Sequence, residues 1–228
     1  MKDHPDPALA AAIVACRRCS RLVDWREEVA RTRRRAYQDQ EYWGKPVPGF
    51  GDPQARVLVI GLAPGAHGAN RTGRVFTGDG AGDFLFRALH QKGFANQPAT
   101  RRRDDGLVLK DLFISAVCRC APPANKPLPE EISNCLPFLE AEMALLNKVK
   151  VIVALGGIAF DYTLRLLCTR GEVAGIRAMK FAHGALYPLG EGLPWLVASY
   201  HPSRQNTQTG RLTVAMFDQI WGQVRALL

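Results

Sequence analysis

No run of eighteen apolar residues occurs in the chain, so the sequence offers no segment long enough to cross a membrane as a helix. The N-terminal stretch MKDHPDPALA lacks the pattern of a secretory signal peptide. The glycine-containing loop that begins at Gly61 matches neither G-x-x-x-x-G-K-S/T nor G-x-G-x-x-G, the two common nucleotide-binding motifs. There is also no internal repeat and no low-complexity tract. We therefore expect a soluble, cytoplasmic protein.

Acidic residues are scarce relative to basic ones: 21 Asp and Glu stand against 30 Lys and Arg, which gives a formal net charge of +9. The excess is uneven, because residues 17–35 contain eight Arg but only three acidic residues. Arg101, Arg102 and Arg103 form a second basic cluster. This distribution favours a polyanionic partner such as a nucleic acid. A solvated basic face without a partner is the alternative.

Apolar runs of strand length alternate with segments of helical periodicity over most of the 228 residues. The runs cover residues 56–62, 111–117, 149–155 and 194–200, and the helical segments cover 80–94, 127–148, 157–168 and 213–228. Continuous apolar strands joined through helices are typical of a parallel sheet buried on both faces. We predict one domain over residues 1–228, a three-layer α/β/α sandwich around a central, mainly parallel four-stranded sheet, with the first roughly 50 residues packed against it.

Two polar loops follow apolar strands of this sheet. Residues 61–79, GLAPGAHGANRTGRVFTGD, come after RVLVI, and residues 201–210, HPSRQNTQTG, come after WLVASY. Since parallel strands end at the same edge of a sheet, the loops are able to face each other across one cleft. Gly61 and Gly65 allow the backbone to approach a flat ligand closely. Asp79 is the only carboxylate of the first loop, and it suits either catalysis or the N-cap of a helix starting near Gly80.

The six cysteines are unlike a disulfide framework in a cytoplasmic chain. Cys16 and Cys19 form a C-x-x-C pair, and Cys120 and Cys135 lie far downstream, which is a spacing that fits a tetrahedral zinc or an iron–sulfur cluster. From spacing alone zinc is favoured, because it is the more common of the two. The remaining two, Cys118 and Cys168, are interpreted as small apolar side chains of the core.

Together, the two polar loops resemble those of the uracil-DNA glycosylase superfamily, in particular its family 5, and the resemblance extends from Cys16 to about residue 215. It implies a monomeric base-excision repair enzyme that binds DNA and hydrolyses the N-glycosidic bond of uracil, leaving an abasic site. Hypoxanthine and xanthine, in single- or double-stranded DNA, are the further substrates that it implies. It also implies a [4Fe–4S] cluster instead of zinc. Its ligands would be Cys16, Cys19, Cys120 and Cys135, with Cys120 chosen because it begins the C-x-P-P run and Cys118 as its competitor.

The resemblance also assigns roles to individual residues. Asp79 matches the acidic residue that activates water or stabilises the sugar cation, and His201 matches the histidine that donates to the uracil O2. Asn125, in PPANKP, matches a pocket-side asparagine for which a turn residue is the alternative, and Phe76 matches a stacking ring for which a core position is the alternative. The rest of the predicted substrate pocket is Gly61, Leu62, Ala63, Pro64, Gly65 and Ala116, and the predicted DNA-binding wedge is Ser203, Arg204, Gln205 and Asn206.

The sequence departs from other uracil-DNA glycosylases at two positions. Ala66 and then His67 follow GLAPG, where most members have Asp or Asn. Ala116 stands where family 4 uses Asn to read the uracil edge. Without these polar atoms, we expect weaker discrimination between uracil and other deaminated bases. Two other functions remain as alternatives: a non-catalytic iron–sulfur or zinc protein that binds nucleic acid, and an N-glycosidase acting on free nucleosides or nucleotides.

Overall fold

The computed structural model describes residues 4–169, 171 and 178–228, so the first three residues of MKDHPDPALA lie outside it. At its centre is a six-stranded sheet with the order β1-β3-β2-β4-β6-β5. The four inner strands are mutually parallel, and the two edge strands are antiparallel to their neighbours. The inner strands are β2 (Val57–Gly61), β3 (Leu112–Ala116), β4 (Val151–Leu155) and β6 (Trp195–Ser199), and the edge strands are β1 (Phe50–Gly51) and β5 (Leu186–Pro188).

The predicted α/β class is confirmed, and the four predicted strands are the four inner ones. The predicted number of four strands is wrong, because the sheet also contains two edge strands of two and three residues. Strands this short carry no recognisable periodicity, and each has one neighbour only, so an apolar run is not required there.

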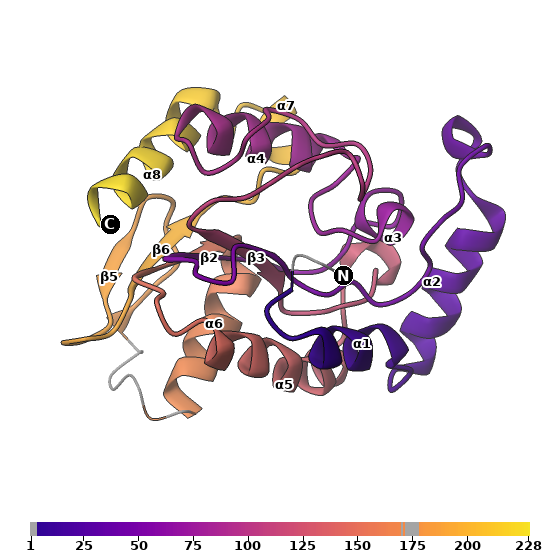
Figure 1. Cartoon of the computed structure of the whole chain (residues 1–228), viewed down its shortest axis with the longest axis horizontal. Coiled ribbons are helices and arrows are strands. Elements are labelled where there is room, and N and C mark those ends of the chain that lie inside the picture. Colours follow the sequence, from indigo (N-terminus) through magenta and orange to yellow (C-terminus); the bar gives the residue numbers. More distant parts are fainter. Residues whose placement is uncertain (1–3, 170, 172–177) are drawn as a thin grey trace.

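Helices cover both faces of the sheet (Figure 1). The helices α4 (Gly80–Gln91) and α8 (Val214–Ala226) pack together on one face, and α5 (Pro129–Leu145) and α6 (Gly157–Thr169) lie on the other. Successive strand residues point to opposite faces, so Val57 and Val59 join the core beneath α4 and α8 whereas Leu58 and Ile60 join the core beneath α5 and α6. This two-sided burial explains why the inner strands are apolar throughout.

The N-terminal segment packs against the side of the sandwich. It contains α1 (Pro7–Ala15), α2 (Ser20–Thr32) and η1 (Arg35–Tyr37), and α1 contacts α5. Arg21 of α2 forms an ion pair with Glu131 of α5 at 2.6 Å. His4 lies 3.2 Å from the buried carboxylate of Glu142, also in α5. Along the described part of the chain, no helix has the length and apolar character that a membrane crossing needs.

The inner strands end flush at one edge of the sheet. Gly61 at the end of β2 pairs with Ala116 at the end of β3, and Leu155 at the end of β4 pairs with Ser199 at the end of β6. Three loops that contain predicted site residues leave this edge. The loop after β2 contains α3 (Ala69–Thr72), the loop after β3 contains η2 (Pro123–Asn125), and the loop after β6 contains α7 (Arg204–Gln208).

Candidate active site

Asp79 is the N-cap of α4, at the end of the loop that follows β2. Its Oδ1 accepts a hydrogen bond from the Gly82 N–H at 2.9 Å, which is the capping role considered from the sequence. Its Oδ2 lies against the loop backbone, since a Cβ added to Gly68 would fall 1.9 Å from that oxygen and one added to Gly65 would fall 3.2 Å from it. Burial raises the pKa of Asp79 above its ordinary value. Capping therefore fixes one carboxylate oxygen and leaves the second at the loop.

The loop around Asp79 is held in shape by the buried side chain of Arg71. Its Nε donates to the His67 carbonyl at 2.8 Å, and its NH2 donates to the Gly78 carbonyl at 2.7 Å. One guanidinium thus bridges the two sides of α3. Neither Arg71 nor Gly68 was expected as a site residue. In a single sequence, an arginine that satisfies buried carbonyls looks the same as one that faces water, so the pattern carries no signal for this role.

Phe76 and His201 bring the two polar loops into contact. Their rings are stacked, with centroids 5.6 Å apart and an interplanar angle of 29°. A Cβ on Gly61 would lie 3.1 Å from the Phe76 ring, so glycine is needed at the end of β2 for this close approach. Phe76 adopts a left-handed φ of 53° and is buried in the core beneath α4. The ring therefore occupies the core position that was its alternative and also stacks on His201.

His201 lies two residues beyond the end of β6, and its carbonyl accepts a hydrogen bond from Asn206 Nδ2 at 2.8 Å. Burial lowers the pKa of His201 to about 4, so the imidazole is neutral near pH 7. Ser203 caps α7 by accepting from the Asn206 N–H at 3.3 Å. The stem of Arg204 lies against Gly80, since a Cβ there would be 3.2 Å from Arg204 Cγ. The second loop thus reaches the start of α4, next to Asp79.

The remaining predicted site residues fall on the same edge of the sheet with different exposure. Ala116 is buried beside Gly61 in the sheet. Asn125 is exposed on η2 with a left-handed φ of 57°, a conformation that Asn tolerates better than most residues. Within the described residues no hydrogen bond joins the Asn125 side chain to Asp79 or His201. Its exposed position on η2 fits the turn residue that was its alternative role. Of the others, Leu62, Ala63 and Gly65 are half-buried, Pro64 is buried and Gln205 is exposed.

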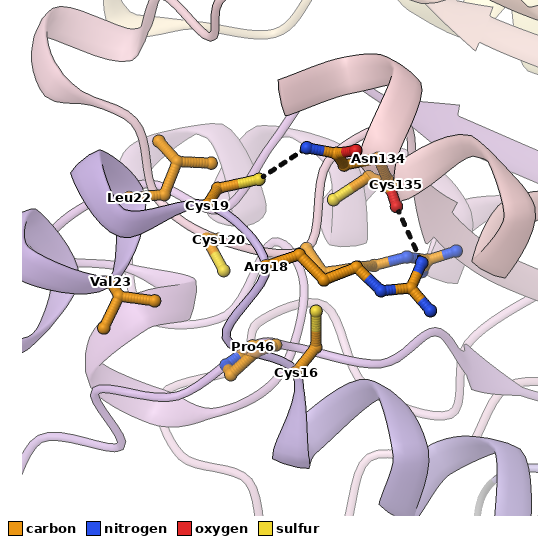
Figure 2. Close-up of a pocket in the computed structure, with 10 residues that line it drawn as sticks. Cys16, Arg18, Cys19, Leu22, Val23, Pro46, Cys120, Asn134 and Cys135 are labelled. Atoms are coloured by element: carbon orange, nitrogen blue, oxygen red, sulfur yellow. Dashed lines mark hydrogen bonds between the residues drawn. The ribbon is translucent and has the colours of Figure 1, made fainter. Parts of the chain in front are cut away.

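A pocket beside α2 is lined by the four cysteines that the sequence selects (Figure 2). Cys16 and Cys19 come from the turn between α1 and α2, Cys120 from the loop after β3, and Cys135 from α5. In the view of Figure 2 their sulfur atoms point toward one common space. Asn134 Nδ2 lies 3.5 Å from Cys19 Sγ. The pocket therefore brings together cysteines from sequence segments that are more than a hundred residues apart.

The competing Cys118 does not line this pocket. It is fully buried, in the same core cluster as Cys135. The interaction between the two thiols lowers the pKa of Cys135 and raises the pKa of Cys118. Burial raises the pKa of Cys120 to about 12. Cys168 is half-buried and packs against the core beneath α6. The geometry therefore groups Cys120, and not Cys118, with the other three pocket cysteines.

The four pocket cysteines can be compared with the donor sets that zinc and a [4Fe–4S] cluster require. Among the described residues, no three His, Cys, Asp or Glu side chains are gathered closely enough to hold a single metal ion. Four thiolates around one zinc would each lie about 2.3 Å from the ion. A [4Fe–4S] cluster instead takes one thiolate at each iron, so its cysteines surround a larger volume. Four thiols that line one pocket are a donor set that fits a [4Fe–4S] cluster.

Arg26 links this pocket to the first loop. Its guanidinium lies beside Cys120, and its carbonyl accepts a hydrogen bond at 3.2 Å from Asn70 Nδ2, in α3. Both residues are buried. Arg26 was missed in the sequence, although a signal was present: it shares one face of α2 with the buried residues Leu22, Val23 and Val29, at spacings typical of a helix stripe that faces the core.

Comparison with known proteins agrees with this arrangement. The family model of the uracil DNA glycosylase superfamily matches residues 48–225. The type-5 uracil-DNA glycosylase of Mycobacterium leprae is 51% identical over 222 residues, which cover 97% of this chain and 95% of that protein. The type-5 uracil-DNA glycosylase of Thermus thermophilus is 51% identical over 220 residues, covering 96% and 97%. A type-4 uracil-DNA glycosylase of Pyrobaculum aerophilum is 34% identical over 164 residues, covering 72% and 74%. The chain therefore belongs to the uracil-DNA glycosylase superfamily and, within it, to the type-5 family.

Proposed function

We propose that this protein is a DNA base-excision repair enzyme that hydrolyses the N-glycosidic bond of uracil and leaves an abasic site. The observation that carries the proposal is the meeting of the two polar loops at one edge of the sheet, where His201 stacks on Phe76 and Arg204 lies against the helix start capped by Asp79. Relatives named type-5 uracil-DNA glycosylases, about half identical over almost the whole chain, support the same activity.

Base removal develops positive charge on the sugar and negative charge on the departing base, and the site offers one group for each. Asp79 is the carboxylate for the sugar side, where it stabilises the cation or orients the attacking water. Its raised pKa, which burial causes, makes it a stronger base than an exposed aspartate. His201 is the donor for the base oxygen, and because its pKa is about 4 it acts as a neutral imidazole.

We propose a substrate range wider than uracil. Ala116 and Ala66 present methyl groups where an amide or carboxylate would otherwise read the edge of the base. A pocket that lacks such polar atoms discriminates less strongly among bases of similar shape. Hypoxanthine and xanthine are therefore proposed as further substrates.

DNA binding is assigned to the α7 loop and to the basic end of α2. Arg204 and Gln205 are exposed and suit a wedge that supports a flipped base. Arg33, Arg34 and Arg35 are exposed just beyond α2 and suit phosphate contacts in single- or double-stranded DNA. We propose that the protein acts as a monomer.

A [4Fe–4S] cluster held by Cys16, Cys19, Cys120 and Cys135 is proposed as the cofactor, because these four thiols line one pocket. When bound, the cluster supplies a structural cross-link between the α1–α2 turn and the β3–α5 connection, and hydrolysis requires no redox step. Through Arg26 and Asn70 this cross-link reaches the loop that contains Gly68 and Asp79.

The activity is tested with end-labelled oligonucleotides that carry one uracil, hypoxanthine or xanthine, both single-stranded and paired. Each is incubated with the protein and divided, and one half is heated in alkali before electrophoresis. We expect strand breaks at the uracil position only in the alkali-treated half, with slower release of the two purines and no release of thymine. Binding of uracil-containing DNA without any alkali-labile product would contradict the proposal and support a non-catalytic nucleic-acid-binding protein.

A further inference from the structure

Two arginine side chains are buried beside the cysteine pocket. Arg26 of α2 and Arg119, which lies between Cys118 and Cys120, are each 1% exposed. Arginine is almost never fully buried without a partner, because removing its charge from water is costly. The partners of these two guanidinium groups therefore indicate what the pocket contains.

Arg26 directs its charge at the cysteines. Its NH1 lies 2.9 Å from Cys120 Sγ, and its NH1 and NH2 donate to the Cys16 carbonyl at 3.4 and 3.3 Å. In the part of the chain that the structure describes, its ion-pair partner is the carboxylate of Glu27, which lies 3.7 Å away and is 45% exposed, so water also solvates that carboxylate. A neutral thiol would compensate a buried guanidinium poorly, whereas a thiolate would compensate it well. The position of Arg26 therefore suits stabilisation of negative charge on the sulfur atoms of this pocket.

Arg119 lines the pocket, and some of its N–H groups have no hydrogen-bond acceptor in the described residues. Its NH2 donates to Glu142 Oε2 at 2.9 Å, which satisfies one end of the guanidinium. Its Nε and NH1, and the Nε of Arg26, are buried and have no hydrogen-bond partner in the described residues. Buried donors without acceptors are rare in native proteins. Arg119 lines the cysteine pocket and Arg26 lies beside it against Cys120, so these three donors point to an acceptor that is not part of the polypeptide.

We propose that Arg26 and Arg119 are buried counter-charges of the [4Fe–4S] cluster, donating N–H groups to its sulfur atoms without ligating iron. The inference rests on the proposed cofactor. A cluster core bound by four thiolates is negatively charged, and its sulfides and thiolates are the acceptors that the arginines lack. Hydrogen bonds of this kind raise the reduction potential and slow loss of the metal group.

Arg26→Met is the main test, because methionine keeps an unbranched side chain and removes the charge. Arg26→Lys keeps the charge but loses the forked contact. The matched control is Arg18→Met: Arg18 lines the same pocket, yet it is exposed and its charge is solvated. The measurements are iron and inorganic sulfide per chain, the rate at which a chelator bleaches the visible absorbance, and the reduction potential of the cluster.

We expect Arg26→Met to lose the cluster roughly 10- to 100-fold faster than wild type and to have a lower potential. The rate of cluster loss in Arg26→Lys should lie between those of Arg26→Met and wild type. The rate in Arg18→Met should stay within about threefold of wild type. For Arg119, Arg119→Met is combined with Glu142→Gln so that no carboxylate is left unpaired, and Glu142→Gln alone is its control. Circular dichroism checks folding, and if Arg26→Met is insoluble the comparison rests on Arg26→Lys.

Bleaching rates and potentials equal to wild type in the arginine variants would overturn the inference, as would an equal effect of Arg18→Met. Iron and sulfide in the wild-type protein separate this outcome from failure of the cofactor proposal. Stoichiometric zinc without sulfide in anaerobically purified protein would refute the cluster and, with it, this role of the arginines. A folded, iron-loaded variant with unchanged cluster behaviour would refute the arginine role alone.

Discussion

Replacing Gly68 by alanine should displace the Asp79 carboxylate. The added Cβ would lie 1.9 Å from Asp79 Oδ2 and 2.7 Å from Asp79 Cγ, and both separations are far inside van der Waals contact. To relieve the overlap the carboxylate has to move by roughly 1.5 Å or more, given an ordinary contact of about 3.5 Å. Its other oxygen is tied to the Gly82 N–H, so the movement also disturbs the cap of α4.

Two magnitudes follow from this displacement. A misplacement of about 1 Å at a reacting group costs on the order of 100-fold in rate, so single-turnover excision should fall by at least that factor. Overpacking typically costs about 1–3 kcal/mol, which for a chain of this size lowers the Tm by roughly 2–12 °C. DNA affinity and iron content should be unchanged, because the three atoms nearest to the added Cβ all belong to Asp79 and Gly68 does not line the cysteine pocket.

The chain provides matched controls for this substitution. Gly222→Ala adds the same methyl group in α8, where nothing lies within 4 Å, and should leave the rate unchanged. Gly65→Ala places a Cβ 3.2 Å from the same Asp79 oxygen and should have a smaller effect than Gly68→Ala. In the Asp79→Ala background the contacts with Oδ2 and Cγ are gone and the one with Cβ at 3.1 Å remains, so Gly68→Ala should lower the Tm less there than it does beside the intact carboxylate. Full activity in Gly68→Ala, or an equal loss of Tm from Gly68→Ala in both backgrounds, would refute the packing argument.

Three further predictions concern base selection, pH and the α7 loop. Ala116→Asn should raise the ratio of uracil to hypoxanthine excision by about tenfold or more, since an amide then reads the base edge; an unchanged ratio would exclude Ala116 from the pocket. His201 takes up a proton below pH 6.5 when unfolded but only near pH 4 when folded, so the native state should lose roughly 3 kcal/mol of stability as pH falls between these values. Urea unfolding of wild type and His201→Gln should show this loss in wild type alone, and parallel curves would contradict it. Arg204→Ala with Gln205→Ala should slow excision from a U·A duplex more than from single strands, because flipping costs a few kcal/mol only in the duplex; equal losses would mean that the loop merely binds DNA.

The sheet was predictable from the sequence where burial is complete and not where it is partial. Each inner strand is covered on both faces, which makes residues such as 57–61 and 151–155 uniformly apolar. The edge strands β1 and β5 are short and paired on one side only, and local composition carries no trace of that pairing. The helices α4, α5, α6 and α8 were found within a few residues, because each keeps a core-facing stripe or a clear N-terminal signal.

The candidate site was predictable for those residues whose position follows from the strand that precedes their loop. Asp79 and His201 follow strands that end at one edge, so strand topology alone brings their loops together. Gly68, Arg71 and Arg26 were missed because their roles depend on what packs against them. Gly68 matters through a carboxylate eleven residues away, and Arg26 through a cysteine 94 residues away. Such contacts exist only in the folded chain.

The most direct test of the account is the single-turnover rate of uracil excision by Asp79→Asn, measured on a U·G duplex beside the Kd for the same DNA. Asparagine retains a side-chain oxygen for the Gly82 N–H but loses the negative charge that the sugar cation requires. We expect a rate at least about 100-fold below wild type, with a Kd within about threefold of wild type. A rate within a few-fold of wild type would contradict it, because Asp79 would then be a helix cap and the catalytic carboxylate would lie elsewhere.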